Sequence, residues 1–181
     1  HEDACLLGIA TVDLHKHPVK MLDQKFVTVA CGEFHTVAID DCGFLWIRDM
    51  KERASLLSDE AVDQQKSLSS FQKIKVDQKF DAISCGQKHT AAIDAEGNIW
   101  AHGANDFGQL GLGPAGKTNS FTRVSPPINN QKFIAISCTE TRTIALDDQS
   151  NVWACGWDGV NKSEAKLFLT KLPIEHVDAL M

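Results

Sequence analysis

Apolar residues along this chain fall in short runs that are rich in β-branched, aromatic and small side chains. Three segments, residues 24–46, 78–100 and 131–153, each contain three such runs and match one another position by position. Runs of about six residues bounded by Asp, Gly and Ser are typical of β-strands, because helices need longer amphipathic stretches. The pattern therefore predicts a repeated unit that supplies three strands at a time.

The spacing of a few residue types is constant in the three copies. Each copy has a phenylalanine near its start, a cysteine five residues later and a tryptophan fifteen residues after the cysteine. These positions are Phe26, Phe80 and Phe133, then Cys31, Cys85 and Cys138, then Trp46, Trp100 and Trp153. Fixed spacing at a period of about fifty residues marks a repeat architecture, in which we expect the tryptophans to anchor the packing of each unit.

Between the second and third run of each copy lies a four-residue turn, DDCG, DAEG or DDQS. Asp favours turns, and Gly43 and Gly97 can adopt a positive φ without a Cβ clash, so we expect hairpins with a left-handed fourth residue. Ser150 replaces the glycine in the third copy, where we expect local strain or a different turn. The aspartates recur once per copy, which indicates turn chemistry and not a catalytic pair.

The linker after each tryptophan differs between copies. In the second copy it contains the glycine-rich stretch GANDFGQLGLG at 103–113, which predicts tight turns with Leu110 packed inward. In the first copy it reads DMKERASLLSD, with Leu56 in the register of Leu110, and apolar residues there fall at helical spacing. We expect a short surface helix or a flexible insertion in the first copy.

Two further runs, FQKIKV at 71–76 and FTRVSPP at 121–127, resemble each other and predict a fourth, outer strand. Four short strands per unit of about fifty residues are typical of a propeller blade. The expected fold class is all-β, a β-propeller of four-stranded antiparallel blades with three repeat cores and two partial blades. The expected divisions are the tail of a preceding blade at 1–23, repeats at 24–77, 78–130 and 131–171, and the start of a further blade at 172–181.

Closed propellers need about four to eight blades, so we expect the remaining blades to come from the same chain or from an associated copy. The chain opens with His1 and not Met, which suggests a longer parent.

Charge and hydropathy narrow the range of partners. The chain carries 18 Lys+Arg against 24 Asp+Glu, a formal charge of −6, so direct nucleic-acid binding is not expected. No uncharged apolar run approaches the roughly 20 residues of a bilayer span, and the first residues lack the pattern of a signal peptide. We expect an intracellular protein, cytoplasmic or nuclear, with no membrane partner.

The cysteines and histidines of the repeats are expected to have structural roles and not to bind metal. The cysteines form no CxxC pair, so zinc is not indicated, and the three repeated ones are expected to be structural thiols. Cys42, in a hairpin turn, is expected to be exposed. His35 and His89 share a repeat position that Arg142 takes in the third copy, which predicts a polar brace between neighbouring strands and not a metal site.

Catalytic and cofactor motifs are not found in the sequence. The glycine-rich stretch does not match GxxxxGK[ST] and follows a strand without opening a helix, so a nucleotide site is not indicated. A GxSxG elbow and a catalytic triad are likewise not found. We expect no catalytic residue, no cofactor and no metal, and therefore a protein that is not an enzyme in the sense of bond chemistry.

With CGQKHTAAIDAEGNIWAHG directly before it, GANDFGQLGLG resembles the regulator of chromosome condensation family of seven-bladed β-propellers. The resemblance extends over nearly the whole chain as weaker copies and is strong in residues 80–113. It implies two kinds of role. The founding member is an exchange factor for the small GTPase Ran and docks on chromatin, whereas many relatives use the same wheel as a docking platform within ubiquitin ligases and kinases. Fold alone does not choose between them.

A fourth tryptophan, Trp157, breaks the repeat and lies in CGWDGV, which favours an exposed aromatic contact residue. With Asp158, and with Asn105, Asp106 and Phe107 of the glycine-rich stretch, it makes up the candidate protein-contact set.

The functional prediction is a protein–protein interaction module. Rigid blades would display the loops 48–70, 103–120 and 156–166 to another protein and so lower the entropy lost on docking. One alternative is a guanine-nucleotide exchange factor for a Ran-like small GTPase. The other is the regulatory propeller of a ubiquitin ligase or kinase, whose catalytic domain would lie elsewhere in a parent protein.

Overall fold

The computed structural model describes residues 24–49, 71–114, 116–160 and 165–173. These residues form twelve strands in three four-stranded antiparallel sheets, which we call blades 1 to 3. In each blade the strands follow one another in chain order, so every blade is a simple meander. The all-β, bladed fold predicted from the sequence is confirmed.

The strand bounds show how regular the repeat is. Blade 1 contains β1 (Phe26–Cys31), β2 (His35–Asp40), β3 (Leu45–Asp49) and β4 (Gln72–Lys73). Blade 2 contains β5 (Phe80–Cys85), β6 (His89–Asp94), β7 (Ile99–Gly103) and β8 (Thr118–Arg123). Blade 3 contains β9 (Phe133–Cys138), β10 (Arg142–Asp147), β11 (Val152–Gly156) and β12 (Lys166–Lys171).

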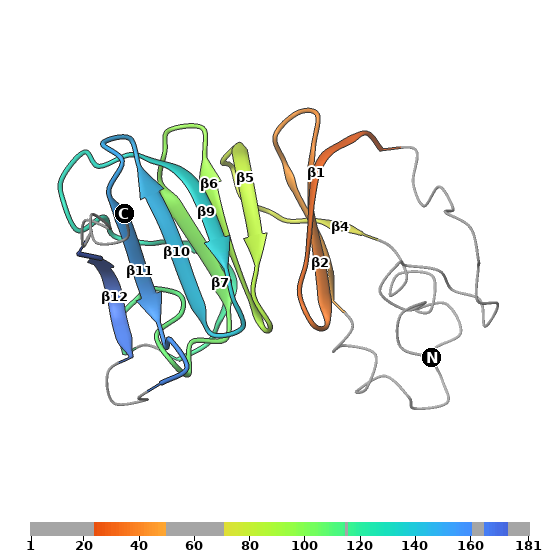
Figure 1. Cartoon of the computed structure of the whole chain (residues 1–181). Coiled ribbons are helices and arrows are strands. Elements are labelled where there is room, and N and C mark those ends of the chain that lie inside the picture. The colour runs from red at the N-terminus through yellow and green to blue at the C-terminus, as the bar shows by residue number, and fades with distance from the viewer. Residues whose placement is uncertain (1–23, 50–70, 115, 161–164, 174–181) are drawn as a thin grey trace, which may run out of the picture.

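The blades lie side by side in chain order, with the orange strands of blade 1 at one end and the blue strands of blade 3 at the other (Figure 1). Strand β5 packs against β1 and β2, and β9 packs against β5 and β6. Every residue of β2 and of β6 is buried, because a further blade covers each of them. In β10 buried residues alternate with half-buried ones, since no blade follows blade 3 among the described residues.

Two apolar clusters fill the spaces between the blades. The cluster between blades 1 and 2 contains Val37, Ile39, Leu45, Phe80, Ala92 and Phe121. The cluster between blades 2 and 3 contains Ile93, Ile99, Ala101, Leu110, Val124, Phe133, Ala145, Trp153, Cys155 and Leu169. Because each cluster draws residues from two consecutive blades, apolar burial joins one blade to the next as well as packing each blade internally.

An aspartate closes each hairpin turn and also holds the tryptophan. Asp94 Oδ1 accepts the backbone N–H groups of Glu96 and Asn98, and Oδ2 accepts the indole N–H of Trp100 at 2.8 Å. The indole bond recurs at Asp40–Trp46 and at Asp147–Trp153. Burial opposes ionisation, but these hydrogen bonds outweigh it and lower the pKa of all three carboxyl groups. The turn role predicted for the aspartates is confirmed, and the bond to the tryptophan is an addition to it.

The fourth residue of each turn adopts the left-handed backbone conformation, as the sequence predicts for the two glycines. Gly43 and Gly97 have φ values of +87° and +85°. Ser150 keeps the same geometry with φ +64°, so the third copy retains the turn type and carries a side chain in a conformation that favours glycine.

The outer strands differ from their expected bounds. In blade 1 the strand is only Gln72–Lys73, and in blade 2 it is Thr118–Arg123, earlier than the predicted 121–127. Pro126 and Pro127 lack a backbone N–H, which accounts for the early end of β8. Strand β12 of blade 3 is an element that the sequence pattern did not predict.

Some expectations fall on residues that the structure does not describe. They are the preceding blade at 1–23, the helix or insertion after β3, and most of the further blade at 172–181. A helix of the length and hydropathy needed to cross a bilayer is not found in the described part of the chain.

Candidate functional site

The candidate contact residues lie at one end of the blades, where the first strand turns into the second and the third into the fourth. We call it the loop end; it contains residues 32–34, 86–88, 104–114, 116–117, 139–141 and 157–160. A repeated polar bond ties the blades together here. His35 Nε2 lies 2.8 Å from Thr90 Oγ1, and His89 Nε2 lies 3.0 Å from Thr143 Oγ1. The predicted histidine brace is confirmed, and it joins each blade to the next.

His89 is a neutral donor in this bond. Thr143 donates its only hydroxyl proton to the backbone carbonyl of Gln109 at 2.7 Å, so Nε2 of His89 carries the proton that Thr143 accepts. Burial, together with the nearby His35, lowers the pKa of His89 to about 4. A buried imidazole committed to a structural bond does not serve as a general base near neutral pH.

The ring of His89 lies against the glycine three residues earlier. A Cβ at Gly86 would lie 2.1 Å from Cε1 of His89 and 2.4 Å from the backbone oxygen of Thr139. In the third copy Thr139 stands at the glycine position and Arg142 at the histidine position. At Gly86 the imidazole and the carbonyl of the next blade together occupy the space that a Cβ would need, whereas the third copy has no such imidazole and no described blade after it.

The repeated cysteines bond to the preceding blade. The thiol of Cys85 donates to the carbonyl of Ala30 at 3.6 Å, and that of Cys138 donates to the carbonyl of Ser84 at 3.5 Å. Burial raises the pKa of Cys85 to about 12 and raises that of Cys138 as well. These two thiols are structural, as predicted, because the reactive thiolate is suppressed.

Two other cysteines are exposed. Cys42 is exposed in its turn, as predicted, whereas the exposure of Cys31 departs from the buried role expected for all three repeated cysteines. No described blade covers the outer side of β1, which explains the difference. The possible ligand atoms of Cys42, Asp40 and Asp41 lie within 4.8 Å of one another. Both oxygens of Asp40 already accept hydrogen bonds, so this group does not indicate a metal site.

The glycine-rich loop 103–113 fills the outer part of the junction between blades 2 and 3. Leu110 is 2% exposed and packs inward, as predicted. Asn105 Oδ1 accepts the backbone N–H of Leu110 at 2.9 Å, and its Nδ2 donates to the carbonyl of Gly113 at 3.1 Å. Asn105 is therefore a buried brace of the loop, which corrects its inclusion among the candidate contact residues.

The other four candidates come together on two adjoining loops. Phe107 stacks on Trp157, with ring centroids 5.2 Å apart and 20° between the planes. Thr141 fixes the backbone of Trp157 by accepting its N–H and by donating a hydroxyl hydrogen bond to its carbonyl. Asp106 and Asp158, next to these aromatics in sequence, are exposed. The sequence had suggested an exposed Trp157, whereas stacking leaves the residue half-buried.

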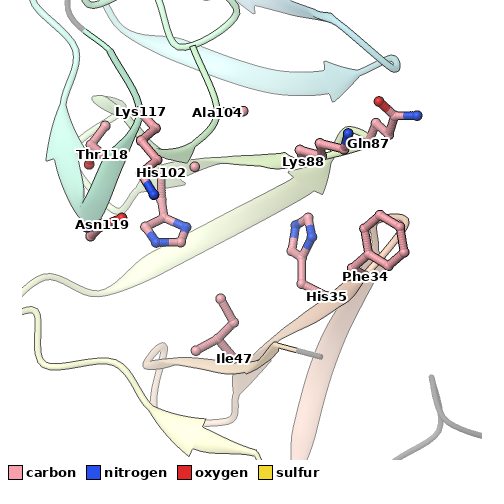
Figure 2. A pocket seen from close by; sticks show the side chains of 11 residues that line it. Phe34, His35, Ile47, Gln87, Lys88, His102, Ala104, Lys117, Thr118 and Asn119 are labelled. Atoms are coloured by element: carbon pink, nitrogen blue, oxygen red, sulfur yellow. The ribbon is translucent and has the colours of Figure 1, made fainter. Parts of the chain in front are cut away.

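Between blades 1 and 2 the loop end carries a cleft of about 500 Å³. Figure 2 shows Phe34 and His35 on the blade 1 side, with His102, Lys88 and Lys117 on the blade 2 side. The two lysines give this cleft a cationic lining. The sequence reasoning did not find the cleft, because its walls come from separate blades and share no motif.

Comparison with family models identifies the repeat. Residues 80–109 and 96–146 match two models described as Regulator of chromosome condensation (RCC1) repeat. The matches cover blade 2 and most of the first two strands of blade 3, and so include residues 80–113, where the sequence resemblance is strong. The chain therefore carries RCC1 repeats, as the resemblance implied.

Relatives and solved structures extend the likeness beyond these residues. The chain is 29% identical over 143 residues to the serine/threonine-protein kinase Nek9 of Mus musculus and 34% identical over 140 residues to the probable E3 ubiquitin-protein ligase HERC4 of the same species. The matches cover 77% and 76% of this chain, but only 14% and 13% of those relatives.

A similar fold occurs in Prp20p from Saccharomyces cerevisiae, a yeast RCC1 that has been described with its binding to Gsp1p and histones. The TM-score is 0.67 at 18% identity, over 86% of this chain and 40% of Prp20p. At that identity the likeness shows the fold, a β-propeller. The chain spans well under half the length of each of these three proteins.

Proposed function

We propose that this set of RCC1 repeats is a non-catalytic interaction module that presents the loop end of its blades to another protein. The observation that carries the proposal is the Phe107–Trp157 stack. It joins the two loops that depart from the repeat, while the repeated residues beneath them are committed to holding the blades together.

The physical argument is one of rigid display. The His–Thr bond, the thiol–carbonyl bond and the apolar cluster recur at both junctions, so the loops start from fixed strand ends. A preformed contact surface loses little conformational entropy on docking, and aromatic side chains supply much of the energy at protein interfaces. The loop end offers both features.

A photo-crosslinking experiment on the full chain tests this proposal. A crosslinking amino acid replaces Lys88 or Asp158 at the loop end, and matched variants carry it at Glu96 or Asp148 in the turns at the opposite end. All four side chains are exposed. We expect one protein to be captured in defined adducts from the loop-end positions only. Equal capture from the turn positions, or capture from none, would overturn the proposal.

A second candidate is a guanine-nucleotide exchange factor for a Ran-like small GTPase. The fold likeness to Prp20p, which has been described with its binding to Gsp1p, favours this candidate. A nucleotide-release assay with a fluorescent guanine nucleotide on Ran and on an unrelated small GTPase tests it. Faster release from Ran at substoichiometric amounts of this chain supports exchange activity, and unchanged release on both GTPases rules it out.

The third candidate is the regulatory propeller of a kinase or a ubiquitin ligase. It is supported by the similarity to Nek9 and HERC4, proteins that are much longer than the matched region. In this role the occupant of the loop end would be a segment or substrate of the attached enzyme. The crosslinking experiment identifies that occupant directly when it is performed on the parent protein.

A further inference from the structure

The two loops that meet at Phe107 and Trp157 form a fixed aromatic surface. Gly156 has φ +96°, and a Cβ there would lie 2.3 Å from the carbonyl oxygen of Thr141. This close approach places Trp157 next to Thr141. The carbonyl of Thr141 accepts the backbone N–H of Trp157, and its hydroxyl donates to the backbone carbonyl of Trp157. The indole is therefore held in position through its backbone as well as through its stack on Phe107.

Trp157 lacks the polar anchor that the other tryptophans have. Each of Trp46, Trp100 and Trp153 donates its indole N–H to the aspartate six residues before it. The indole nitrogen of Trp157 is buried and has no hydrogen-bond partner in the described structure. Burying an unpaired donor costs stability, so Trp157 is held by its stack and its backbone bonds and not by an indole hydrogen bond.

Acidic residues adjoin the two stacked aromatic residues in sequence. Asp106 precedes Phe107 and Asp158 follows Trp157, and both side chains are exposed. Asp158 Oδ1 accepts the backbone N–H of Val160, which fixes the carboxylate at the loop tip, and Val160 itself is 87% exposed.

Charged residues of both signs lie at this edge. Glu140, next to Thr141, adds a third exposed carboxylate to those of Asp106 and Asp158. Cations also lie here, because Arg142 and Lys166 both pair with Gly156 and the carbonyl of Lys88 accepts the backbone N–H of Ala104. The chain as a whole carries a net charge of −6.

We propose that the aromatic–acidic patch formed by Asp106, Phe107, Trp157 and Asp158 binds an arginine-bearing basic segment of a partner protein. A guanidinium group stacks on an indole face and pairs with a carboxylate through two N–H groups, a combination that a lysine ammonium provides less well. The inference rests on the proposed function and names the chemistry of the partner.

Peptide binding to the full chain tests the proposal. The probes are a fluorescein-labelled peptide of alternating Arg and Gly, the same peptide with Lys for Arg, and the same peptide with Glu for Arg. We expect saturable binding of the arginine peptide, several-fold weaker binding of the lysine peptide and no binding of the glutamate peptide in fluorescence anisotropy. Rising salt should weaken binding without removing the preference for arginine.

Variants locate the binding site. Trp157→Ala should weaken arginine-peptide binding about tenfold, and Asp158→Asn about three- to tenfold. Trp157→Leu keeps an apolar side chain under Thr141 and should also weaken binding, which separates loss of the aromatic face from loss of loop packing. Asp148→Asn makes the same charge change at the opposite end and should leave the dissociation constant within about twofold.

Three results would overturn the proposal. They are equal binding of the arginine and lysine peptides, equal losses for Asp158→Asn and Asp148→Asn, and absence of arginine-peptide binding. The crosslinking outcome is independent of these results. A partner captured at the loop end that the arginine peptide does not displace would leave the proposed function standing and reject this patch as its site.

Discussion

Each junction between blades has an inner half, formed by the first two strands of each blade, and an outer half beside the third and fourth strands. The two junctions share the inner half and differ in the outer half. In both, a histidine bonds to the threonine of the next blade, and an inner-strand thiol bonds to the preceding blade. In the outer half the junction between blades 2 and 3 is filled by the loop 103–113, whereas the junction between blades 1 and 2 carries a cleft lined by Lys88 and Lys117. The repeated residues thus specify how blades are joined, and the linkers specify what the loop end offers to a partner.

The side chains that the two outer halves expose also differ in kind. Lysines line the cleft between blades 1 and 2, whereas exposed aspartates adjoin the stacked aromatic residues in sequence at the junction between blades 2 and 3. The scaffold underneath is the same, so this difference is a property of a few side chains. It implies that one propeller can present neighbouring surfaces of unlike chemistry without a change of fold.

Among the substitutions that test this difference between the junctions, Leu110→Ala should have the largest effect on stability. It opens a cavity in the outer half of the junction between blades 2 and 3, and we expect it to lower the free energy of unfolding by about 2–5 kcal/mol. Urea denaturation measures the loss. Val160→Ala, at an 87% exposed position, is the control and should change stability by less than about 0.5 kcal/mol. A loss below about 1 kcal/mol for Leu110→Ala would show that the loop does not seal the junction.

The free energy of unfolding should depend on pH through His89, which lies in the inner half of the junction between blades 2 and 3. The folded state keeps this ring neutral with a pKa of about 4, while the unfolded chain binds a proton below its usual value of 6.5. The contribution to stability is therefore complete above pH 6.5 and is lost as the pH falls toward 4, by about 3 kcal/mol for one group. Denaturation between pH 7 and 4 measures the slope. His89→Gln should flatten it, and an unchanged slope would assign the dependence to other groups.

Asp94→Ala removes the acceptor of two backbone N–H groups and of the Trp100 indole. We expect a loss of about 2 kcal/mol in the free energy of unfolding, because partly buried donors lose their acceptor. The near-ultraviolet circular dichroism of tryptophan should weaken at the same time. Asp81→Ala, on the exposed side of β5, is the matched control and should leave both signals close to those of the parent chain. Equal effects from the two changes would contradict the assigned role of Asp94.

Ser150→Gly should give the smallest change in the free energy of unfolding, and it should raise stability where the other substitutions lower it. The residue has φ +64°, and glycine relieves the strain at that angle, although it adds entropy to the unfolded chain. We expect a gain of up to about 1 kcal/mol. Gly97→Ser makes the reverse change in blade 2 and should lower the melting temperature. Stabilisation by both changes, or by neither, would show that the turn angle is not the cause.

Much of the fold could be predicted because its signals are local. The Phe, Cys and Trp spacing located the first three strands of every blade, and Asp with Gly located the turns. The outer strands were less certain because they are short, exposed and weakly patterned, as Gln72–Lys73 shows. The aspartate–tryptophan bond was missed, although its signal is present as a constant spacing of six residues in each copy.

The candidate site was harder to predict because it depends on which loops meet. Phe107 and Trp157 were both singled out, but nothing local indicates that their rings stack. Asn105 has the residue type of a polar contact, and only the path of the loop shows it to be a buried brace. The paired change of Gly86 and His89 to Thr139 and Arg142 was visible in the alignment of the copies, and its steric reason required the ring position.

The bonds between blades follow the same pattern at both junctions, which bears on how such a wheel is enlarged. The backbone N–H of Phe80 donates to Gly43 of blade 1, and that of Phe133 donates to Gly97 of blade 2. At the loop end donation runs the other way, from the backbone N–H of Glu33 to Gln87 and from that of Gln87 to Glu140, so each unit offers donors and acceptors to its neighbours. A duplicated unit inserted in frame would find both, and gene duplication in multiples of this length is the growth step that the architecture tolerates.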